Sequence, residues 1–564
     1  MKPADVETNR PSLLAALVPV LVLIGLLGVN VYLFGEDSSY GPNQIALLLA
    51  AATAAIAGVC FKTPFKKMLE GVEKAIGSAL TAMLILLLIG SLAGTWMMSG
   101  IVPTMIYYGL DILNPKIFLF ASAVVCAIVS VATGSSWSTV ATVGIALLGI
   151  GSALGVSEAL AAGAIISGAY FGDKISPLSD TTNLAAAMAG TDLIRHIKYM
   201  LWTTIPSFTI ALVIYLVIGF SGDATAAVAD TSGLKAEMLS HFDTLSPILL
   251  IVPLVVFAMV IMKFDAVAAL FVGAVLGGVF AIIFQPQMIT KVAGLDDVSI
   301  VDAETGKVTT EPPSYLKRSY VAFVNSMAFE TLGVSDADTE KVNAALDKAK
   351  LESARRQTDN LELTLDEFKE LESSSEIELA ETFPELEERV ASNIAAAKLL
   401  KGKGMNGMLN TIWLIITAMC FGGIMEACGF LRRITEPLIA ISKSNGALVA
   451  TTTGSCVFVN ATASDQYLAI VVPGQMFRET YRERGLAPEN LSRTLEDAGT
   501  VTSVLIPWNT CGAAQAGVLG VTTWLYAPFC FFNLISPLMT MVVAFFGIGI
   551  AQTVGDEKSD KVQK

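Results

Sequence analysis

The sequence predicts an all-α polytopic membrane protein with about ten transmembrane helices, and two observations lead to this fold class. The 564 residues are 54% hydrophobic and only 15% charged, with a mean hydropathy of +0.64, whereas soluble domains carry about 25% charged residues. Apolar windows long enough to cross a bilayer recur along most of the chain. Since every backbone N–H and C=O needs an internal partner in lipid, these windows should be helices.

Eight of the windows are continuous enough to predict simple spans. They lie at 12–34, 43–61, 76–99, 200–220, 247–262, 265–284, 406–427 and 524–550. Four further apolar regions are interrupted by Gly, Pro, Ser, Thr, Asn and Asp: 116–153, 158–190, 438–475 and 495–516. We therefore expect a different geometry in these four regions.

The basic residues indicate what that geometry is. Membrane proteins concentrate Lys and Arg in short cytoplasmic loops. Four basic clusters occur along this chain: Lys62, Lys66, Lys67 and Lys74; Arg195, His196 and Lys198; Arg432 and Arg433; and Lys558, Lys561 and Lys564. All can be cytoplasmic together only if 116–153 and 438–475 are re-entrant hairpins and 158–190 and 495–516 are broken helices that cross once. This arrangement gives ten crossings with both termini in the cytoplasm.

One long stretch differs in composition from the rest. Residues 285–403 contain 23 acidic and 14 basic side chains, and the predicted topology makes this stretch an acidic extracytoplasmic insertion. Amphipathic helices are expected around Val342–Ala349 and Leu386–Ala397. The insertion is either a cap or dimer contact, or a solvated segment without a transport role.

Two halves of the chain echo each other, which predicts an inverted repeat. The matches pair Trp96–Ile101 with Met425–Phe430, Ala132–Trp137 with Thr452–Val457, Ile175–Leu178 with Leu505–Trp508, and Asp180–Asn183 with Asn509–Gly512. The predicted units are an N-terminal tail and first helix (1–42), the first repeat (43–220), an extracytoplasmic loop and connecting helix (221–264), the second repeat (265–523), and the last helix and tail (524–564). Paired interrupted segments in inverted repeats are typical of alternating-access transporters.

The most informative segment is Gly168–Asn183, which places Asp173, Lys174 and Asp180 in an apolar setting. Ionisable residues inside a membrane are functional candidates because they are costly to bury. Pro177 bars a regular helix, so the chain should open there and expose oxygen atoms to a hard cation. Candidate co-ligands are Ser176, Ser179, Thr181, Thr182 and Asn183. The alternative is a Lys174–Asp173 ion pair at a helix kink.

The second half has a corresponding candidate in Asp465, the single acid between Asn445 and Phe477. Burial disfavours the charged form of a carboxyl group, so such a residue can hold a proton at one moment and a cation at another. The co-ligand candidates here are Asn460, Thr462, Ser464, Asn509 and Thr510. The alternative is a protonated acid whose only role is to form hydrogen bonds between neighbouring helices.

Several other polar residues have weaker signals. Glu426 and Lys174 are secondary candidates for a proton path, and Ser135 and Ser136 could be ligands at the tip of the first hairpin. His196 and His241 are expected in loops, so a proton carrier in the membrane should be a carboxylate or a lysine. The alternating charges from Arg478 to Glu496, including Arg493, are interpreted as a cytoplasmic loop.

These motifs resemble those of the NhaC-type Na⁺/H⁺ antiporter family. Gly172–Asn183 is similar to that family's signature, and Asn460–Gln466, Pro473-Gly474 and Pro507–Thr510 are similar to its second-half motifs. The resemblance covers about 12–284 and 405–550 and implies the ion-transporter superfamily, whose members pair hairpins with broken helices. It implies a homodimer of elevator type in a bacterial or archaeal cytoplasmic membrane, in contact with lipid, with Na⁺ and H⁺ as transported ions. No cofactor, catalytic residue or nucleic-acid partner is implied.

By the same resemblance, Asp173, Asp180 and Asp465 are the candidates for ion binding and proton coupling. Na⁺ is assigned to Asp180, Asn183, Asp465 and Asn460. The insertion at 285–403 is the chief departure from the family pattern, and it leaves the motifs intact.

Two other functions are compatible with some of these residues. An organic-acid exchanger of the malate–lactate type on the same fold would need a positive feature aimed at a carboxylate; Lys174 could serve, but no intramembrane arginine is evident. An intramembrane aspartyl protease could use Asp173 with Asp180 or Asp465 to activate water. However, Tyr170 stands where the protease signature requires glycine, and the inverted repeat would be unexplained.

Overall fold

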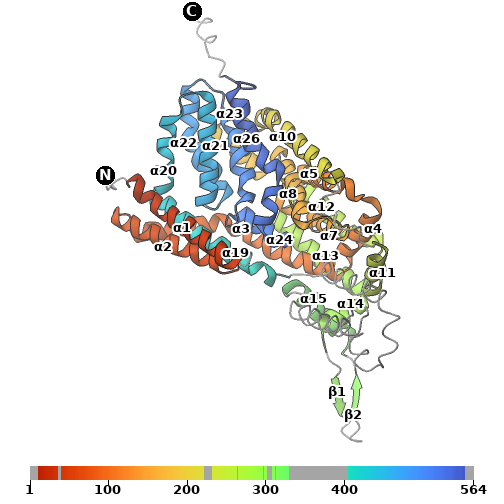
Figure 1. Cartoon of the computed structure of the whole chain (residues 1–564). Helices are drawn as coiled ribbons and strands as arrows, with labels where there is room; N and C mark the ends of the chain where they lie inside the picture. The colour runs from red at the N-terminus through yellow and green to blue at the C-terminus, as the bar shows by residue number, and fades with distance from the viewer. Residues whose placement is uncertain are drawn as a thin grey trace, which may run out of the picture.

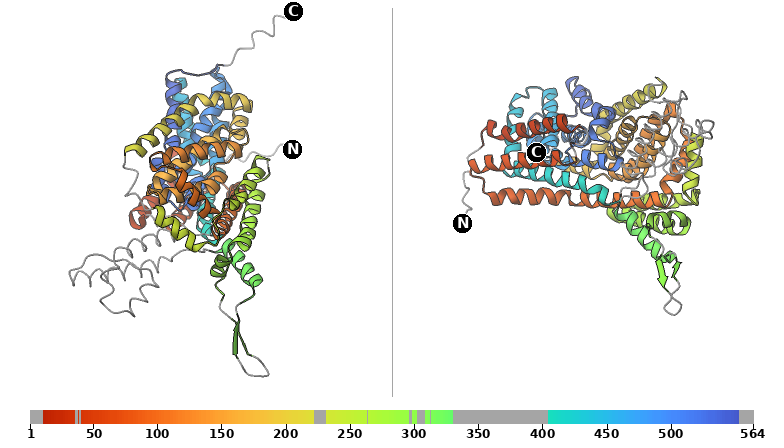
Figure 2. Two further views of the ribbon diagram at one scale, coloured as in Figure 1. Left: turned by 90° about the vertical axis from the view of Figure 1, so that its right-hand side faces the viewer. Right: turned by 60° about the horizontal axis from the view of Figure 1, so that its bottom comes forward.

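The computed structural model describes residues 11–35, 38, 40–221, 231–262, 264–295, 298–301, 308–311, 313–329 and 404–552. Within these ranges the chain forms a helical bundle from which one small β-hairpin projects (Figures 1 and 2). The two sequence segments expected to be amphipathic helices, 342–349 and 386–397, lie outside the described residues.

The first half of the bundle contains the predicted first helix, α1, and the elements of the predicted first repeat. They are α1 (Leu13–Phe34), α2 (Pro42–Cys60), α3 (Phe65–Met98), α4 (Ile101–Ile112), η2 (Pro115–Ile117), α5 (Phe118–Thr133), α6 (Ser136–Thr139), a π-helical turn η3 (Val140–Gly144), α7 (Ile145–Ala153), α8 (Glu158–Ile175), α9 (Asp180–Ala189) and α10 (Leu193–Ser221).

The middle of the chain contains the connecting helices and the described part of the insertion. These elements are α11 (Thr231–His241), η4 (Pro247–Leu250), α12 (Ile251–Ile261), α13 (Ala266–Phe284), α14 (Pro286–Ala293), the antiparallel strands β1 (Val298–Val301) and β2 (Val308–Glu311), and α15 (Tyr315–Ala328). The strands pair in register from Val298 opposite Glu311 to Val301 opposite Val308.

The second half repeats the pattern of the first. Its elements are η5 (Asn406–Met408), α19 (Leu409–Ala427), α20 (Phe430–Ile441), α21 (Asn445–Thr462), α22 (Gln466–Glu483), α23 (Pro488–Leu495), a π-helical turn η6 (Glu496–Thr500), η7 (Ser503–Leu505), α24 (Thr510–Leu519), α25 (Thr523–Tyr526), η8 (Ala527–Phe529) and α26 (Phe531–Phe545).

Eight helical segments in the described part of the chain are long and apolar enough to cross a membrane, or nine with one bent pair. The eight include both legs of the hairpin at 116–153 and neither of the two interrupted helices, so the number of crossings stays a prediction. The segment expected as one span at 524–550 is two helices, Thr523–Phe529 and Phe531–Phe545, bent by 56°. The segment expected at 247–262 is the shorter apolar helix Pro247–Ile261. The chain is a polytopic, helical membrane protein.

The segment 116–153 forms a helical hairpin. Helix α5 ends at Gly134, whose φ of 67° is left-handed and suits glycine, and the chain then returns through α6, η3 and α7. The return brings Gly151, near the end of α7, against Phe118 at the start of α5. Both ends of the hairpin therefore lie on the same side of the molecule.

Helices α8 and α9 form one path that is interrupted at Ser176–Ser179. Helix α8 lies alongside α5 so closely that Gly168 meets the Ala123 carbonyl and Gly172 meets the Ala127 carbonyl. The break itself packs against the hairpin tip, since Leu178 and Ser179 contact Gly134. The tip of the first hairpin and the break in the first interrupted helix are thus at one level.

Helices α21 and α22 form the second hairpin, whose tip is Ala463–Asp465. Ser464 at this tip has a φ of 59°, which is uncommon for a residue other than glycine. The second interrupted helix runs from α23 through η6 and η7, opens at Ile506–Asn509 and continues as α24. The Thr510 amide donates to the Ser464 carbonyl (2.9 Å), so the second tip also meets the second break.

The two halves correspond at a nearly constant spacing along the chain. The left-handed residues Gly134, Gly155 and Gly190 have their counterparts at Ser464, Gly485 and Gly520. Three of the four predicted motif matches agree with this register to within one residue. The pairing of Ala132–Trp137 with Thr452–Val457 is wrong, because the first segment contains a hairpin tip and the second lies in the middle of α21.

The hairpins approach the centre from opposite ends of the molecule. Helix α9 leads away from the first break, and its last turn packs on the far part of α22: Met188 lies against Gly474 and Gly190 against Arg478. The end of α9 and the base of the second hairpin are therefore on one side, while the base of the first hairpin is on the other. This arrangement agrees with an inverted repeat.

A second group of helices, α1–α3, α12, α13 and α19, packs beside the hairpins (Figure 1). Their contacts depend on glycine: Gly71 and Gly423 bring α3 and α19 together at the backbone. Gly422 of α19 also lies against the Ala463 carbonyl at the second hairpin tip. Close approach through small residues is the usual way in which membrane helices associate.

The described part of the insertion contacts the bundle at one end. Helix α15 packs on α3, where Gly94 meets the Ser326 carbonyl, and the Ser91 hydroxyl donates to the Met327 carbonyl (3.0 Å). Strands β1 and β2 project away from the helices (Figure 2). Helix α15 is therefore anchored on a transmembrane helix, while the role of the insertion stays a prediction.

Candidate functional site

Four helices begin where the two hairpin tips and the two breaks meet. A side chain caps each of them: Ser135 accepts from Ser138 N–H at α6, and Ser179 accepts from Thr182 N–H at α9. Asp465 accepts from Leu468 N–H at α22, and Asn509 accepts from Cys511 N–H at α24. Such caps satisfy amide groups that a helix start leaves unpaired, so the sequence itself specifies where each half-helix begins.

Asp173 is buried at the end of α8 and is held by the first hairpin tip. Its Oδ2 accepts hydrogen bonds from the Ser136 hydroxyl (2.7 Å) and the Ser136 amide (3.2 Å). Its Oδ1 is buried without a hydrogen-bond partner among the described residues. Since a buried acceptor is normally satisfied, Oδ1 is an available ligand at the centre of the fold.

Asp180 connects the first break to the second hairpin. It lies at the first position of α9 on the exposed side of the break, and its Oδ2 accepts from the Tyr467 hydroxyl (2.5 Å). Tyr467 is two residues from Asp465. The Asp180 carboxylate interacts electrostatically with Asp173, and Asp465 interacts electrostatically with Tyr467. The three predicted acids therefore lie in the same region of the fold.

The polar residues around the second break form a connected network. The Asn460 amide donates to the Gly499 carbonyl (2.6 Å) and to the Thr502 hydroxyl (3.0 Å). The Asn509 amide in turn donates to the backbone and side-chain oxygens of Asn460 (3.0 and 3.1 Å). Ser130 is the residue of the first repeat that corresponds to Asn460. Its hydroxyl donates to the Ala169 carbonyl (2.6 Å), which is a simpler arrangement.

The remaining predicted co-ligands divide into two groups. Most donate to backbone carbonyls: Thr182 to Lys174, Thr462 to Phe458, and Asn183 to Pro177 and Ser179 nearby in the chain, and Ser176 to Val131 of α5. Thr181 bonds to Ser179, and Thr510 contacts the Asn509 side chain. The Ser464 hydroxyl is buried without a partner in the described structure, so it is free to bind an ion.

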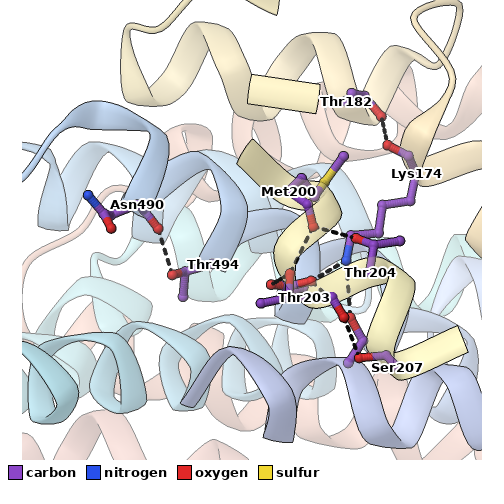
Figure 3. Close-up of polar contacts among 10 residues, drawn as sticks. Lys174, Thr182, Met200, Thr203, Thr204, Ser207, Asn490 and Thr494 are labelled. Carbon is purple, nitrogen blue, oxygen red and sulfur yellow. Dashed lines mark hydrogen bonds and ion pairs between the residues drawn. The ribbon is translucent and has the colours of Figure 1, made fainter. Parts of the chain in front are cut away.

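Lys174 does not pair with Asp173, which corrects one of the alternatives considered from sequence. Its ammonium points away from the hairpin tips and forms a fully buried ion pair with Asp497 of η6. It also donates to the Ser536 hydroxyl of α26 (3.1 Å), and Asp497 accepts from Ser536 (2.9 Å) and from Thr203 of α10 (2.8 Å). Figure 3 shows Lys174 extending from α8 toward Thr203.

Glu426 lies at the edge of the bundle and not in its centre. It forms an ion pair with Lys74 (3.3 Å), whose side chain is 75% exposed. Both residues line an open cavity of about 500 Å³ between α3, α19 and α20. Asp465 still lies within electrostatic range of Glu426, but the residues that line this cavity belong to α3, α19, α20 and the segments beside them and not to the second hairpin tip.

Comparison with known proteins identifies the family. A family model described as "Na+/H+ antiporter family" matches residues 168–308 and 367–548, which include both signature motifs. A Na⁺/H⁺ antiporter NhaC of Alkalihalophilus pseudofirmus is 34% identical, over 91% of this chain and 91% of its own length. The chain belongs to the NhaC-type Na⁺/H⁺ antiporter family.

Relatives at similar identity have different named substrates. The malate-2H⁺/Na⁺-lactate antiporter of Bacillus subtilis is 29% identical, over 90% of each chain. The arginine/ornithine antiporter ArcD of Halobacterium salinarum is 31% identical, over 96% of this chain and 93% of its own. The protein is therefore a secondary transporter of this family and not an enzyme, which removes the protease alternative.

Sequence reasoning missed a group of charged residues in this NhaC-type chain. Arg493 and Glu496 were interpreted as part of a cytoplasmic loop, but both are fully buried, as is Asp497. His196, expected in a loop, is buried in α10. A signal for Glu496 and Asp497 was present, because both lie inside the region 495–516 that was predicted as an interrupted helix.

Proposed function

We propose that this protein exchanges Na⁺ for H⁺ across the cytoplasmic membrane by alternating access. The observation that carries the proposal is the meeting of Asp173, Asp180 and Asp465 where two hairpin tips join two interrupted helices. Both cations need a negatively charged site that excludes bulk water, and intramembrane acids at broken helices supply one.

The chemistry of the site favours a cation over an anion. Asp180 and Asp465 occupy the starts of α9 and α22, where an anionic substrate would otherwise interact with the helix dipole. The buried cation nearest the tips, Lys174, is already paired with Asp497. Na⁺ prefers oxygen ligands, as other hard cations do, and we propose Asp180, Asn183, Asp465 and Asn460 as its ligands, with Asp173 nearby.

Coupling follows if a proton and Na⁺ compete for the same acids. Asp173 and Asp465 are almost completely buried, and an ionised buried carboxylate is costly unless a counter-charge is present. Binding of either H⁺ or Na⁺ neutralises the site, so each would displace the other. The exchanger would then release one ion on the side from which it takes the other.

Alternating access is proposed to be an elevator movement of the hairpins and interrupted helices against α1–α3, α12, α13 and α19. The close, side-chain-free contact between Gly422 and Ala463 is suited to sliding. We further propose a homodimer built on the second group of helices, with both termini in the cytoplasm. The first and last described residues support the placement of both termini on one side of the membrane. Pro11 contacts Arg433 of α20, and Gln552 pairs with Leu486 beyond α22.

The test is Na⁺-driven proton movement in proteoliposomes, with a pH-sensitive dye and an imposed pH gradient. Na⁺ should dissipate the gradient with the wild-type protein but not with Asp465→Asn. Asp111→Asn is the matched control, because Asp111 is 61% exposed and pairs with Lys235; it should behave as wild type.

A different set of results would contradict Na⁺/H⁺ exchange and point to another substrate. If Na⁺, Li⁺ and K⁺ all leave the gradient intact while malate or lactate collapses it, the protein is an organic-acid exchanger on the same fold. Collapse by arginine or ornithine would instead point to amino-acid exchange.

A further inference from the structure

Glu496 is a fully buried acid that the proposed cation site does not use. It begins the π-helical turn η6, a distortion that is often found at functional sites. Neither of its carboxyl oxygens has a hydrogen-bond partner among the described residues. Thr500, four residues further on, lies close to this carboxyl, and its hydroxyl also lacks a hydrogen-bond partner in the described structure.

Charged groups from two elements interact electrostatically with Glu496. Lys174 and Asp173 approach from α8, and Asp497 is adjacent on η6. Buried His196 of α10 completes the cluster, since both Lys174 and Asp497 act on it. The ring nitrogens of His196 have no hydrogen-bond partner within the described residues. The cluster thus spans both repeats and reaches the side where α10 begins.

The charges of this cluster can be balanced in only one simple way. The Lys174 ammonium and the Asp497 carboxylate neutralise each other, and two hydroxyl groups complete the shell of Asp497. An ionised Glu496 would add a second buried negative charge beside an ammonium that is already paired with Asp497, and an unpaired buried charge is strongly disfavoured. Glu496 therefore holds its proton in this conformation.

We propose that Glu496 carries the exchanged proton, with Lys174 as the counter-charge that allows it to ionise. This inference rests on the proposed function and changes one step of it: Na⁺ binds at the tip acids Asp173, Asp180 and Asp465, and the proton that it displaces leaves from Glu496 instead of from those acids. Binding of one Na⁺ at the hairpin tips, beside Asp173, adds one positive charge near the cluster. The O–H bond of Glu496 then breaks, its proton leaves to water, and Lys174 shares its ammonium between two carboxylates. One cation enters and one proton leaves, so the total charge is unchanged.

The experiment separates proton movement from Na⁺ movement in Glu496→Gln. Glutamine has the shape and neutrality of protonated glutamate, so the fold should be retained. Na⁺-driven proton movement should be lost, whereas exchange of ²²Na⁺ for unlabelled Na⁺, which needs no net proton transfer, should continue. Glu479→Gln, on the exposed part of α22, is the control and should keep both activities.

Each other outcome has a defined meaning. If Glu496→Gln retains Na⁺-driven proton movement, or loses both activities while correctly folded, the proposal is wrong. If this variant does not fold, Glu496→Met removes the same proton with an apolar side chain and must give the same separation. If the wild type shows no Na⁺-driven proton movement at all, the proposed function itself fails, whatever the variants do.

Discussion

At the scale of single residues, glycine decides how closely the two central helices approach. Gly168 of α8 lies against the Ala123 carbonyl of α5, and Gly172 lies against the Ala127 carbonyl one turn further. A β-carbon at either position would collide with backbone atoms that cannot move independently. The hairpin can therefore present Ser136 to Asp173 only because these two residues have no side chain.

We expect Gly168→Ala to destabilise the protein by about 1–3 kcal/mol, the usual cost of overpacking a dense interior. The measurement is the melting temperature of the purified protein in detergent. Gly454→Ala is the matched control, because a β-carbon there meets no atom within 4 Å, and alanine is the better helix former. Equal melting temperatures for the two variants would contradict the packing account.

At the scale of elements, the Lys174–Asp497 pair joins four segments that are far apart in sequence. Lys174 comes from α8 and Asp497 from η6, while Ser536 of α26 and Thr203 of α10 complete their hydrogen bonds. A fully buried pair of this kind fixes which elements are neighbours, because neither charge can be left alone. The first interrupted helix is thereby tied to the second repeat.

Removing one member of the pair should be worse than removing both. Lys174→Met alone leaves Asp497 charged and buried, so we expect a loss of about 3–5 kcal/mol. The double variant Lys174→Met/Asp497→Asn contains no unpaired charge and should recover most of that loss. Melting temperatures of the wild type, both single variants and the double variant form the test, and simple additivity would refute the coupling.

At the scale of the whole molecule, the repeats are arranged so that each hairpin has its base on the opposite side from the other. Asn114 lies exposed at the base of the first hairpin, and Lys443 lies exposed at the base of the second. The contacts of α9 with α22 fix this arrangement. Under the proposed alternating access, such a structure would open its centre to either side by the same movement in reverse.

Labelling of single cysteines can test this arrangement in intact cells. In a background without the seven native cysteines, Asn114→Cys should react with a membrane-impermeant maleimide added outside. Lys443→Cys should react only after the membrane is permeabilised. Reaction of both from the same side would mean that the repeats are not inverted in the membrane.

Much of the architecture followed from local chemistry. Apolar length predicted the helices, and the interruptions at Pro177 and Pro507 predicted where they would break, because proline cannot continue a helix. The basic clusters predicted which segments enter and leave on one side. The repeat was detectable because each break needs a capping residue at its start, as Ser179 and Asn509 provide.

The tertiary structure decided what local pattern could not express. Whether Lys174 pairs with Asp173 or with Asp497 depends on which helix lies beside α8, and a neighbour 323 positions away leaves no local signal. The burial of Arg493, Glu496 and Asp497 was missed for the same reason, since their charges resemble those of a loop until other helices cover them. Composition and periodicity therefore determined the spans and their breaks, while packing between the repeats determined which charges meet.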